Sequence, residues 1–217
     1  MDSMTGIKIP SKAAIGEYFF RLYFGNGSPI DLCVRRAYLD LRRTLHGIGT
    51  LPKAENLYHA ASDMVRTLLT DMLEDSSVSD RSTFDNWHRQ QCERLIELYA
   101  SWGFPFFSVG QAQKWINMGL KYAVTLGAVG ALPGIDQERI FSIAHAPLDN
   151  IFLKALERRG HHPDLKLRPW SRIASYDTYF AFQVWLREEF SDSAPLAVEF
   201  GLWLQEMSLV TDVPRSE

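Results

Sequence analysis

The amino-acid sequence predicts an all-α protein. Apolar residues recur at helical spacing in one segment after another, and no stretch shows the alternating β-branched residues that are typical of strands. Residues that start helices (Ser, Asp, Pro) and the residue that most often ends them (Gly) stand at the limits of these segments. We therefore expect a two-lobed helical bundle of about nine helices with little or no sheet.

The first half of the chain contains five expected helices. A Gly-Asn-Gly stop at residues 25–27 ends the first, and Pro29 stands just inside the start of the second. Ser82 or Thr83 is the expected cap of the fourth helix, and Ser108 is the expected cap of the fifth. The five helices are expected over residues 13–24, 29–45, 54–73, 83–102 and 109–126.

Four more helices are expected after a Gly-rich turn at residues 127–136. Because Pro147 disfavours helix at the residue before it, the link at residues 145–148 is expected to be extended. Asp149 then begins a new helix. The four helices are expected over residues 137–144, 149–159, 176–190 and 195–207.

The composition limits the class of protein. Of the 217 residues, 46% are hydrophobic and 12% aromatic, which gives enough apolar mass for a sizeable core and excludes disorder. No window is apolar enough for a membrane span, and residues 1–4 lack the basic start of a secretory signal. The two cysteines, Cys33 and Cys92, allow neither a disulfide framework nor a thiolate zinc site. We expect one cytoplasmic domain over residues 1–217, with no metal, no cofactor and no membrane partner.

Charge is unevenly placed along the chain, although the net charge is only −3. Residues 111–173 carry nine Lys and Arg against five Asp and Glu, whereas residues 174–217 carry two against eight. A basic middle segment is compatible with a face that binds a polyanion. It is also compatible with pairing between the middle and the acidic C-terminal segment, and the lack of a densely basic stretch favours this pairing.

The helix expected over residues 109–126 is unusually polar on one side. Lys114, Asn117 and Lys121 stand at i, i+3 and i+7 and therefore share a face, while Gln113 and Asn117 form an i, i+4 pair. By itself this pattern favours a solvated face beside a stripe of core residues, which would be Trp115, Met118 and Tyr122.

Two further features follow along the chain. Residues 132–135 (Leu-Pro-Gly-Ile) form a tight turn between helices, and such a turn presents backbone N–H groups that suit a phosphate oxygen. Asp149 starts a helix after an extended link, where a carboxylate commonly serves as an N-cap worth about 1 kcal/mol. Each feature alone has a plain structural explanation. Their order along the chain is more informative than any one of them.

A helix, a Leu-Pro-Gly-Ile hairpin, a second helix, a short link and a helix-starting Asp149 together resemble the helix-hairpin-helix family of DNA glycosylases. The resemblance covers roughly residues 108–160, about a quarter of the chain. It implies that the hairpin grips the DNA backbone. It also implies that Asp149 faces the sugar of a flipped-out nucleotide, where it stabilises developing positive charge or activates water.

The chain departs from the family pattern at two places, and its spacing between the hairpin and Asp149 is shorter than the family pattern leads us to expect. Asp136 stands where the family hairpin usually has a second glycine. Residues 137–139 (Gln-Glu-Arg) stand where bifunctional members carry a lysine early in the second hairpin helix. A lysine nucleophile would therefore come from Lys114 or Lys121 on the preceding helix.

The resemblance implies N-glycosidic cleavage that removes a modified or damaged base from double-stranded DNA. A fixed carboxylate stabilises oxocarbenium character, and a flipped base needs an aromatic platform and amide groups that read its edge. The hairpin and catalytic segment is expected over residues 108–173, against lobes over residues 1–107 and 174–217. The expected site comprises Asp149, Lys114 and Lys121 as catalytic residues, Gln113, Trp115, Asn117, Tyr122 and Trp170 around the base, and Leu132, Gly134, Ile135 and Arg139 on the DNA backbone.

Two alternative interpretations stay open. Arg81 and His88, with six residues between them, resemble the Arg–His spacing of the HEPN family of helical ribonucleases, in which the pair acts on the 2′-OH and the phosphate. A packed pair of His88 and Cys92 at i, i+4 is the simpler explanation of that histidine. The other alternative is a non-enzymatic helical interaction protein of a bacterial defence or regulatory system, with Trp185 and Trp203 available for partner contacts.

Overall fold

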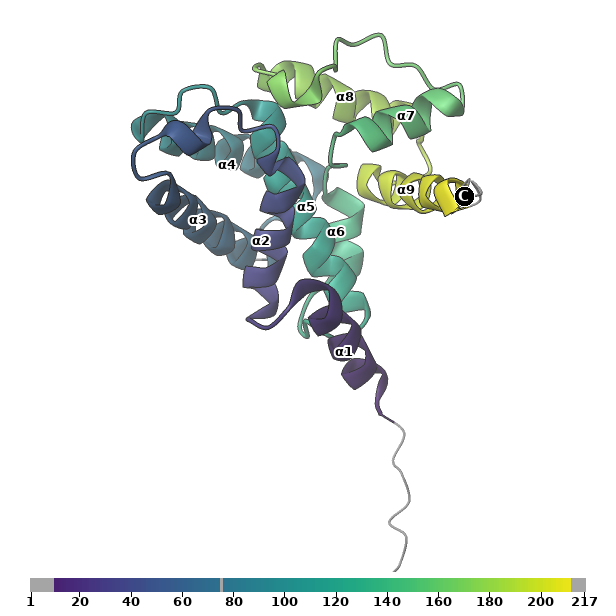
Figure 1. The fold of residues 1–217 in the computed structure, drawn as a ribbon. Coiled ribbons are helices and arrows are strands. Elements are labelled where there is room, and N and C mark those ends of the chain that lie inside the picture. Colours follow the sequence, from purple (N-terminus) through teal and green to yellow (C-terminus); the bar gives the residue numbers. More distant parts are fainter. Residues whose placement is uncertain (1–9, 75, 212–217) are drawn as a thin grey trace, which may run out of the picture.

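The computed structural model describes residues 10–74 and 76–211, and within these ranges the chain forms α-helices and short 3-10 helices with no strand (Figure 1). The predicted all-α class is confirmed. Residues 1–4, on which the expected absence of a leader depends, lie outside the described ranges. The elements are α1 (Lys12–Phe24), α2 (Pro29–Arg42), η1 (Ile48–Thr50), α3 (Ala54–Glu74), α4 (Arg81–Ser101), α5 (Val109–Ala128), α6 (Gln137–Ile143), α7 (Asn150–Arg158), η2 (Trp170–Arg172), α8 (Tyr176–Glu189) and α9 (Pro195–Thr211).

The helix ends follow local chemistry. Ser108 caps α5 as predicted, and its hydroxyl accepts from the Gln111 amide while the Gln111 side chain accepts from the Ser108 amide. The predicted cap of α4 is wrong, because Asp80 begins that helix and Thr83 is the reciprocal partner three residues later. The sequence offers three oxygen-bearing side chains close together there, and the aspartate accepts most strongly.

Helix α5 lies at the centre of the molecule. Figure 1 shows it between α2, α3 and α4 on one side and the group of α7, α8 and α9 on the other. Most of its residues are buried, and the Trp115 indole donates to the Val34 carbonyl of α2 at 3.0 Å. The predicted solvated face is therefore wrong. Its polar side chains are buried because partners from distant parts of the chain bind most of their polar atoms, although Asn117 Oδ1 has no hydrogen-bond partner.

Gly110 lets η2 approach the first turn of α5. A β-carbon at this position would lie 1.9 Å from the Trp170 carbonyl oxygen, and the Gly110 amide donates to the Ile173 carbonyl at 3.0 Å. Only a residue without a side chain allows such an approach. The Ser108 hydroxyl also donates to the Ser171 carbonyl at 2.7 Å. These contacts fix Trp170 beside α5.

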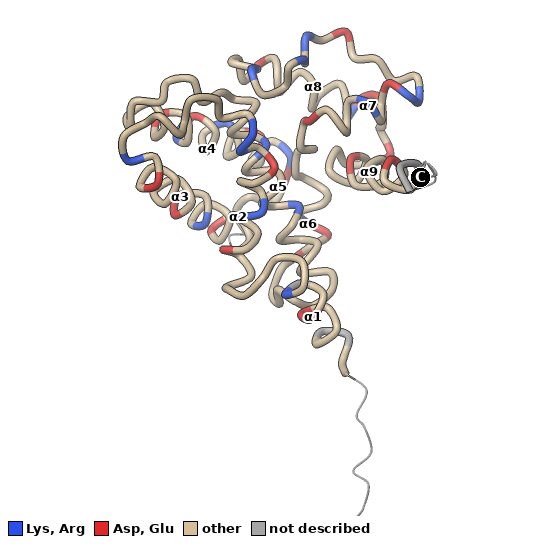
Figure 2. Tube along the Cα trace, viewed as in Figure 1, with Lys and Arg blue, Asp and Glu red and all other residues tan. Residues whose placement is uncertain are grey.

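The basic middle segment pairs with the acidic C-terminal segment, as the favoured interpretation of the charge pattern predicts. Glu206 of α9 accepts from both Arg158 and Arg159 at the end of α7. Lys121 of α5 pairs with Glu199 of α9 at 2.6 Å. Figure 2 shows acidic positions along α9 close to basic positions of α7. None of the helices in the described ranges combines the length and apolarity that crossing a membrane requires.

Candidate functional site

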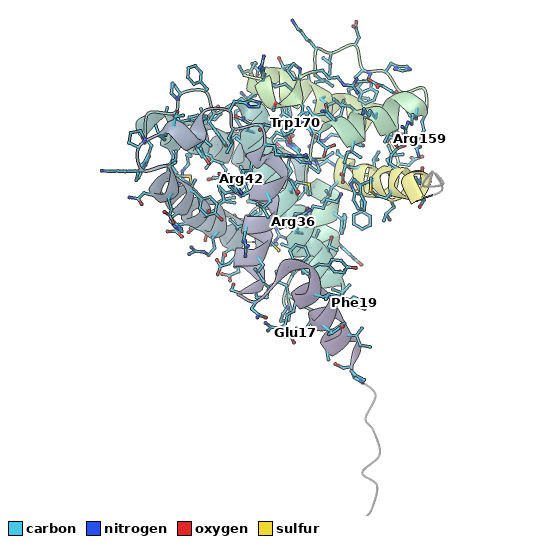
Figure 3. The ribbon with its side chains drawn as sticks, in the orientation of Figure 1. Glu17, Phe19, Arg36, Arg42, Arg159 and Trp170 are labelled. Carbon is cyan, nitrogen blue, oxygen red and sulfur yellow. The ribbon has the colours of Figure 1, made fainter. Side chains whose placement is uncertain are left out.

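A cavity of about 910 Å³ lies between α2, α5, the start of α7, η2 and α9. Its volume falls within the range of sites that hold small ligands, and several of its lining side chains are charged or aromatic. Figure 3 shows Arg36 on α2 and Trp170 on η2, two of the lining residues. The lining comprises Phe24, Arg36, Leu39, Asp40, Arg43, Thr44, Lys114, Met118, Lys121, Tyr122, Thr125, Asp149, Asn150, Ile151, Trp170, Glu199, Phe200 and Trp203.

Asp149 and Lys114 form an ion pair in the cavity wall. The Lys114 Nζ lies 2.5 Å from Asp149 Oδ2, and the two side chains are only 4% and 16% exposed. The other carboxylate oxygen, Oδ1, accepts from the Phe152 amide at 2.8 Å and caps α7. Asp149 is thus a helix cap and a cavity residue at once. The N-cap explanation is confirmed through Oδ1, while Oδ2 pairs with Lys114.

A second ion pair lies two turns further along α5. Lys121 Nζ is 2.6 Å from Glu199 Oε2, and the ammonium also lies about 5 Å from the ring centres of Phe200 (5.4 Å) and Trp203 (5.3 Å). The Glu199 side chain is 2% exposed. Burial raises the pKa of Glu199 above its ordinary value, and the nearby Lys121 ammonium opposes this rise. Two buried lysines on one face of α5 therefore each meet a carboxylate beside the cavity.

Two glutamines hold the extended link that leads to Asp149. Gln183 of α8 donates to the Ala146 carbonyl at 2.9 Å and accepts from the Ala146 amide at 3.0 Å. Gln113 of α5 makes the same pair of bonds with Leu148, at 3.0 and 3.1 Å. Each side-chain amide thus pairs with both backbone groups of one residue, as a neighbouring β-strand would. Residues 145–148 belong to no helix or strand, so their backbone groups need side-chain partners. The bonds from Gln113 and Gln183 therefore fix where α7 begins.

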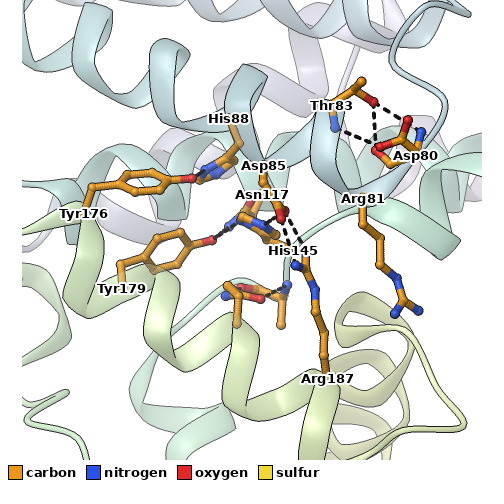
Figure 4. Close-up of polar contacts among 12 residues, drawn as sticks. Asp80, Arg81, Thr83, Asp85, His88, Asn117, His145, Tyr176, Tyr179 and Arg187 are labelled. Carbon is orange, nitrogen blue, oxygen red and sulfur yellow. Dashed lines mark hydrogen bonds and ion pairs between the residues drawn. The ribbon is translucent and has the colours of Figure 1, made fainter.

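A buried polar network continues from this link towards α4 and α8 (Figure 4). His145 lies 2.8 Å from Asp85 through Nε2 and 3.0 Å from the Tyr179 hydroxyl through Nδ1. Asn117 donates to the same Tyr179 hydroxyl at 2.8 Å and to Gln113 at 3.1 Å. Arg187 donates to both oxygens of Asp85 at 2.6 and 2.8 Å.

The network has a defined charge state. Burial raises the pKa of Asp85, but the hydrogen bonds from Arg187 and His145 outweigh it and lower this pKa to about 2. Burial lowers the pKa of His145 and holds that of His88 well below 6.5. The ion pair of Asp85 and Arg187 therefore stands beside two neutral imidazoles.

The structure brings together only part of the expected site. Asp149, Lys114, Lys121, Tyr122 and Trp170 all line the cavity. Gln113, Trp115 and Asn117 do not belong to the lining, because their polar atoms bind the link, the Val34 carbonyl and Tyr179 within the protein.

The hairpin residues lie away from the cavity. Leu132 and Ile135 pack on a small apolar cluster with Leu32 and Cys33, and Gly134 takes a positive φ of 86° in the exposed turn. None of these residues is among the cavity-lining side chains. Arg139 donates to the carbonyls of Val78, Met72 and Leu73 and thereby fixes the end of α3.

Several cavity residues were not anticipated from the sequence: Arg36, Asp40, Arg43, Glu199, Phe200 and Trp203. For one of these residues, Glu199, the sequence contains a pattern that indicates a buried ion pair. Glu199 is a single acidic residue within an otherwise apolar stretch (Pro-Leu-Ala-Val-Glu-Phe), and an acid in such a stretch requires a buried partner.

The ribonuclease interpretation meets a geometric obstacle. His88 is 0% exposed, and its Nδ1 lies 2.7 Å from the Tyr176 hydroxyl. The Cys92 sulfur lies 3.7 Å from the same nitrogen, in agreement with the predicted packed pair. Arg81 donates instead to the Ser142 carbonyl at 3.3 Å. A histidine so enclosed does not reach an RNA backbone without local opening of the fold.

Comparisons with protein-family models, with curated proteins and with solved structures found no match to this chain. No group of three or more His, Cys, Asp or Glu side chains in the described ranges could hold a metal ion.

Proposed function

We propose that the protein is a DNA glycosylase that removes a modified or damaged base from double-stranded DNA by N-glycosidic cleavage. The observation that carries this proposal is the position of the Lys114–Asp149 ion pair in the wall of a cavity of about 910 Å³. That space accommodates a flipped nucleoside, which is a drug-sized group. The carboxylate is held on a helix terminus and by a lysine, so it is preorganised before substrate enters.

Asp149 is the residue that acts on the sugar. As the bond between C1′ and the base nitrogen breaks, its electron pair leaves with the base and positive charge grows on the sugar ring. A carboxylate in a site that excludes water stabilises this charge strongly. When water adds to C1′, Asp149 accepts the proton that the water releases. The departed base, which carries the electron pair, then takes this proton from Asp149, so the carboxylate is regenerated and no group is needed beyond the substrate, a water molecule and this side chain.

Lys114 has two conceivable roles, and its contacts favour one. A lysine that attacks C1′ must do so as a free amine, but Lys114 is held in an ion pair with Asp149. Orientation of the carboxylate is the role that matches this contact. Hydrolysis by water leaves the ion pair in place, whereas attack by Lys114 requires that it be broken. Lys121 and Glu199 form the adjoining wall of the cavity as a buried ion pair. Trp170 and Tyr122 supply aromatic surface.

The test is base release from DNA duplexes that carry modified bases, with wild type and Asp149→Asn compared. Asparagine is as good an N-cap as aspartate, so this change retains the cap of α7 and removes the negative charge, and with it the ion pair to Lys114. We expect loss of at least 100-fold in rate, in the range found when one group that stabilises transition-state charge is removed.

The matched control is Asp80→Asn, the same change at the N-cap of α4, which does not line the cavity. This control should release base at the wild-type rate. Wild-type protein that leaves every duplex intact would overturn the proposal, as would an active Asp149→Asn.

A second candidate function, an interaction protein, is favoured by one feature. Helix α1 exposes an apolar stripe at i, i+3, i+4, i+7 and i+8, which Figure 3 marks at Phe19. A stable complex on pull-down that is lost when this stripe is made polar, combined with no base release, would support it. The stripe consists of Ile15, Tyr18, Phe19, Leu22 and Tyr23.

A further inference from the structure

We infer that Arg43 and Arg36, on one face of α2 at the edge of the cavity, form the site that binds a DNA phosphodiester next to the flipped nucleotide. This inference rests on the proposed function and adds a partner contact to it. It places the DNA backbone beside the flipped nucleotide across α2 and not on the hairpin. The phosphates of a nucleotide are attached to its sugar, so they remain at the rim when the base enters the cavity.

The charges around the cavity single out Arg43. The lining contains four basic side chains, Arg36, Arg43, Lys114 and Lys121, against three acidic ones. Lys114 and Lys121 are paired with Asp149 and Glu199, and Arg36 lies 3.5 Å from Asp40. The Arg43 guanidinium has no hydrogen-bond or ion-pair partner among the described residues, and only the Arg43 backbone amide donates, to the Leu41 carbonyl. The rim therefore presents a guanidinium whose donors are available to an anion.

Arg36 is the second donor of this site. It stands seven residues before Arg43, which places both on the same face of the helix. Its side chain is 48% exposed, and its contact with Asp40 at 3.5 Å is long for an ion pair. A phosphate at the rim competes with Asp40 for this guanidinium. Asp40 keeps a second donor, because the Tyr122 hydroxyl donates to it at 2.6 Å.

The backbone that carries Arg43 is fixed in place. Arg43 caps the C-terminus of α2, and the Gln111 side chain of α5 donates to the carbonyl of Thr44 at 2.9 Å and to its hydroxyl at 3.0 Å. The end of α2 is thereby tied to the helix that carries both lysines of the cavity. A guanidinium on an anchored backbone loses less conformational freedom when it binds a phosphate.

The hairpin provides a weaker alternative for the same contact. The cation that follows it, Arg139, already donates to three carbonyl oxygens. Asp136, at the start of α6, has a carboxylate that repels phosphate. Neither residue lines the cavity.

The chain contains its own matched control. Arg35 and Arg42 are the immediate neighbours of Arg36 and Arg43, are also exposed on α2, and do not line the cavity (Arg36 and Arg42 are labelled in Figure 3). Arg42→Gln and Arg43→Gln change the net charge equally, at the same helix end. A general electrostatic attraction to DNA responds equally to both changes, whereas a phosphate contact at the cavity responds to only one.

The experiment measures binding of a fluorescent DNA duplex with a central tetrahydrofuran abasic-site analogue, as a function of salt concentration. We expect Arg43→Gln to weaken binding about tenfold at about 0.1 M salt and to lower the salt slope by about one. Arg36→Gln should act in the same direction, and the double variant should lower the slope by about two. Arg35→Gln and Arg42→Gln should bind within about twofold of wild type.

Equal effects of Arg42→Gln and Arg43→Gln, with wild type still binding the duplex, would overturn this inference and leave the proposed function standing. A wild-type protein that neither binds the duplex nor releases a base would overturn the proposed function and this site with it. Circular dichroism of each variant checks that the helices are retained.

Discussion

Gln113 binds both the amide and the carbonyl of Leu148, the residue that directly precedes Asp149. A side chain on the central helix thus sets the position of the backbone from which the proposed catalytic carboxylate extends. The same glutamine accepts from Asn117, which is bound to Tyr179 and through it to His145. The buried network therefore reaches Leu148, the neighbour of the cavity-lining Asp149.

Replacement of this glutamine should affect catalysis as well as stability. Gln113→Leu leaves two buried backbone groups of Leu148 unpaired, and we expect it to lower the free energy of unfolding by about 3 kcal/mol. Gln183→Leu does the same to Ala146 and should cost a similar amount. Urea denaturation gives both values.

The rate of base release per folded molecule separates the two variants. We expect kcat to fall at least tenfold in Gln113→Leu, with KM little changed, because Asp149 loses its alignment while the cavity remains. Gln183→Leu, whose bonds lie three residues from Asp149, should retain most of its kcat. Equal kcat values in the two variants would show that Gln113 has only a structural role.

Removal of Lys114 should be costly because its partner stays buried. In Lys114→Met the Asp149 carboxylate, which is mostly buried, loses its counter-charge, and we expect a loss of about 2–3 kcal/mol in the free energy of unfolding. Lys154→Met on the exposed side of α7 is the control and should change it by less than about 0.5 kcal/mol. A cost below that of the control would show that the pair contributes no stability.

The buried histidines predict a loss of stability in mild acid. In the folded chain the pKa values of His88 and His145 lie below the ordinary value of 6.5, so the unfolded chain binds more protons at low pH. The contribution of these histidines to the free energy of unfolding should be constant above pH 6.5 and fall below it, by up to about 1.4 kcal/mol per pH unit for each histidine. Below about pH 4, protonation of Asp85, whose pKa is about 2, adds to the loss.

Urea denaturation over a series of pH values tests this dependence. His88→Gln should remove one histidine's share of the slope, whereas His46→Gln, a change at an exposed position, should keep the wild-type slope. A slope that is unchanged in His88→Gln would contradict the assignment of a neutral imidazole at this position.

Gly110 and Gly201 should respond in opposite ways to alanine. A β-carbon at position 110 would lie 1.9 Å from the Trp170 carbonyl, so Gly110→Ala must displace η2. We expect a cost of more than about 2 kcal/mol in the free energy of unfolding. Position 201, within α9, has open space where an alanine methyl group would lie, and Gly201→Ala should stabilise by about 0.5–1 kcal/mol. Thermal denaturation distinguishes these signs.

The α-helices of the described ranges could be predicted from the sequence because their signals are local. Periodicity, Pro29 inside α2, the Ser108 cap and the Gly-rich turns each act over a few residues. The error at the start of α4 is also local, since Asp80, Ser82 and Thr83 compete for one cap. Helix α2 ends at Arg42, before the predicted residue 45, because the chain turns into η1.

The site could be predicted only in part because its contacts are not local. Lys114 and Lys121 were recognised by their spacing and Asp149 by its place at a helix start. Gln113 and Asn117 were expected around a ligand, but their partners come from residues 148 and 179, which spacing along one helix does not reveal. Glu199 was missed for the same reason, since its partner lies 78 residues away.

The residues that line the cavity are spread along the chain from Phe24 to Trp203, so no fragment of the chain forms the cavity alone. A compound that binds in this cavity binds the folded chain and is released when the chain unfolds. Such a compound raises the melting temperature in proportion to the logarithm of its concentration above Kd. Melting curves measured with a panel of free bases and nucleosides are therefore a direct way to find which compounds bind in this cavity.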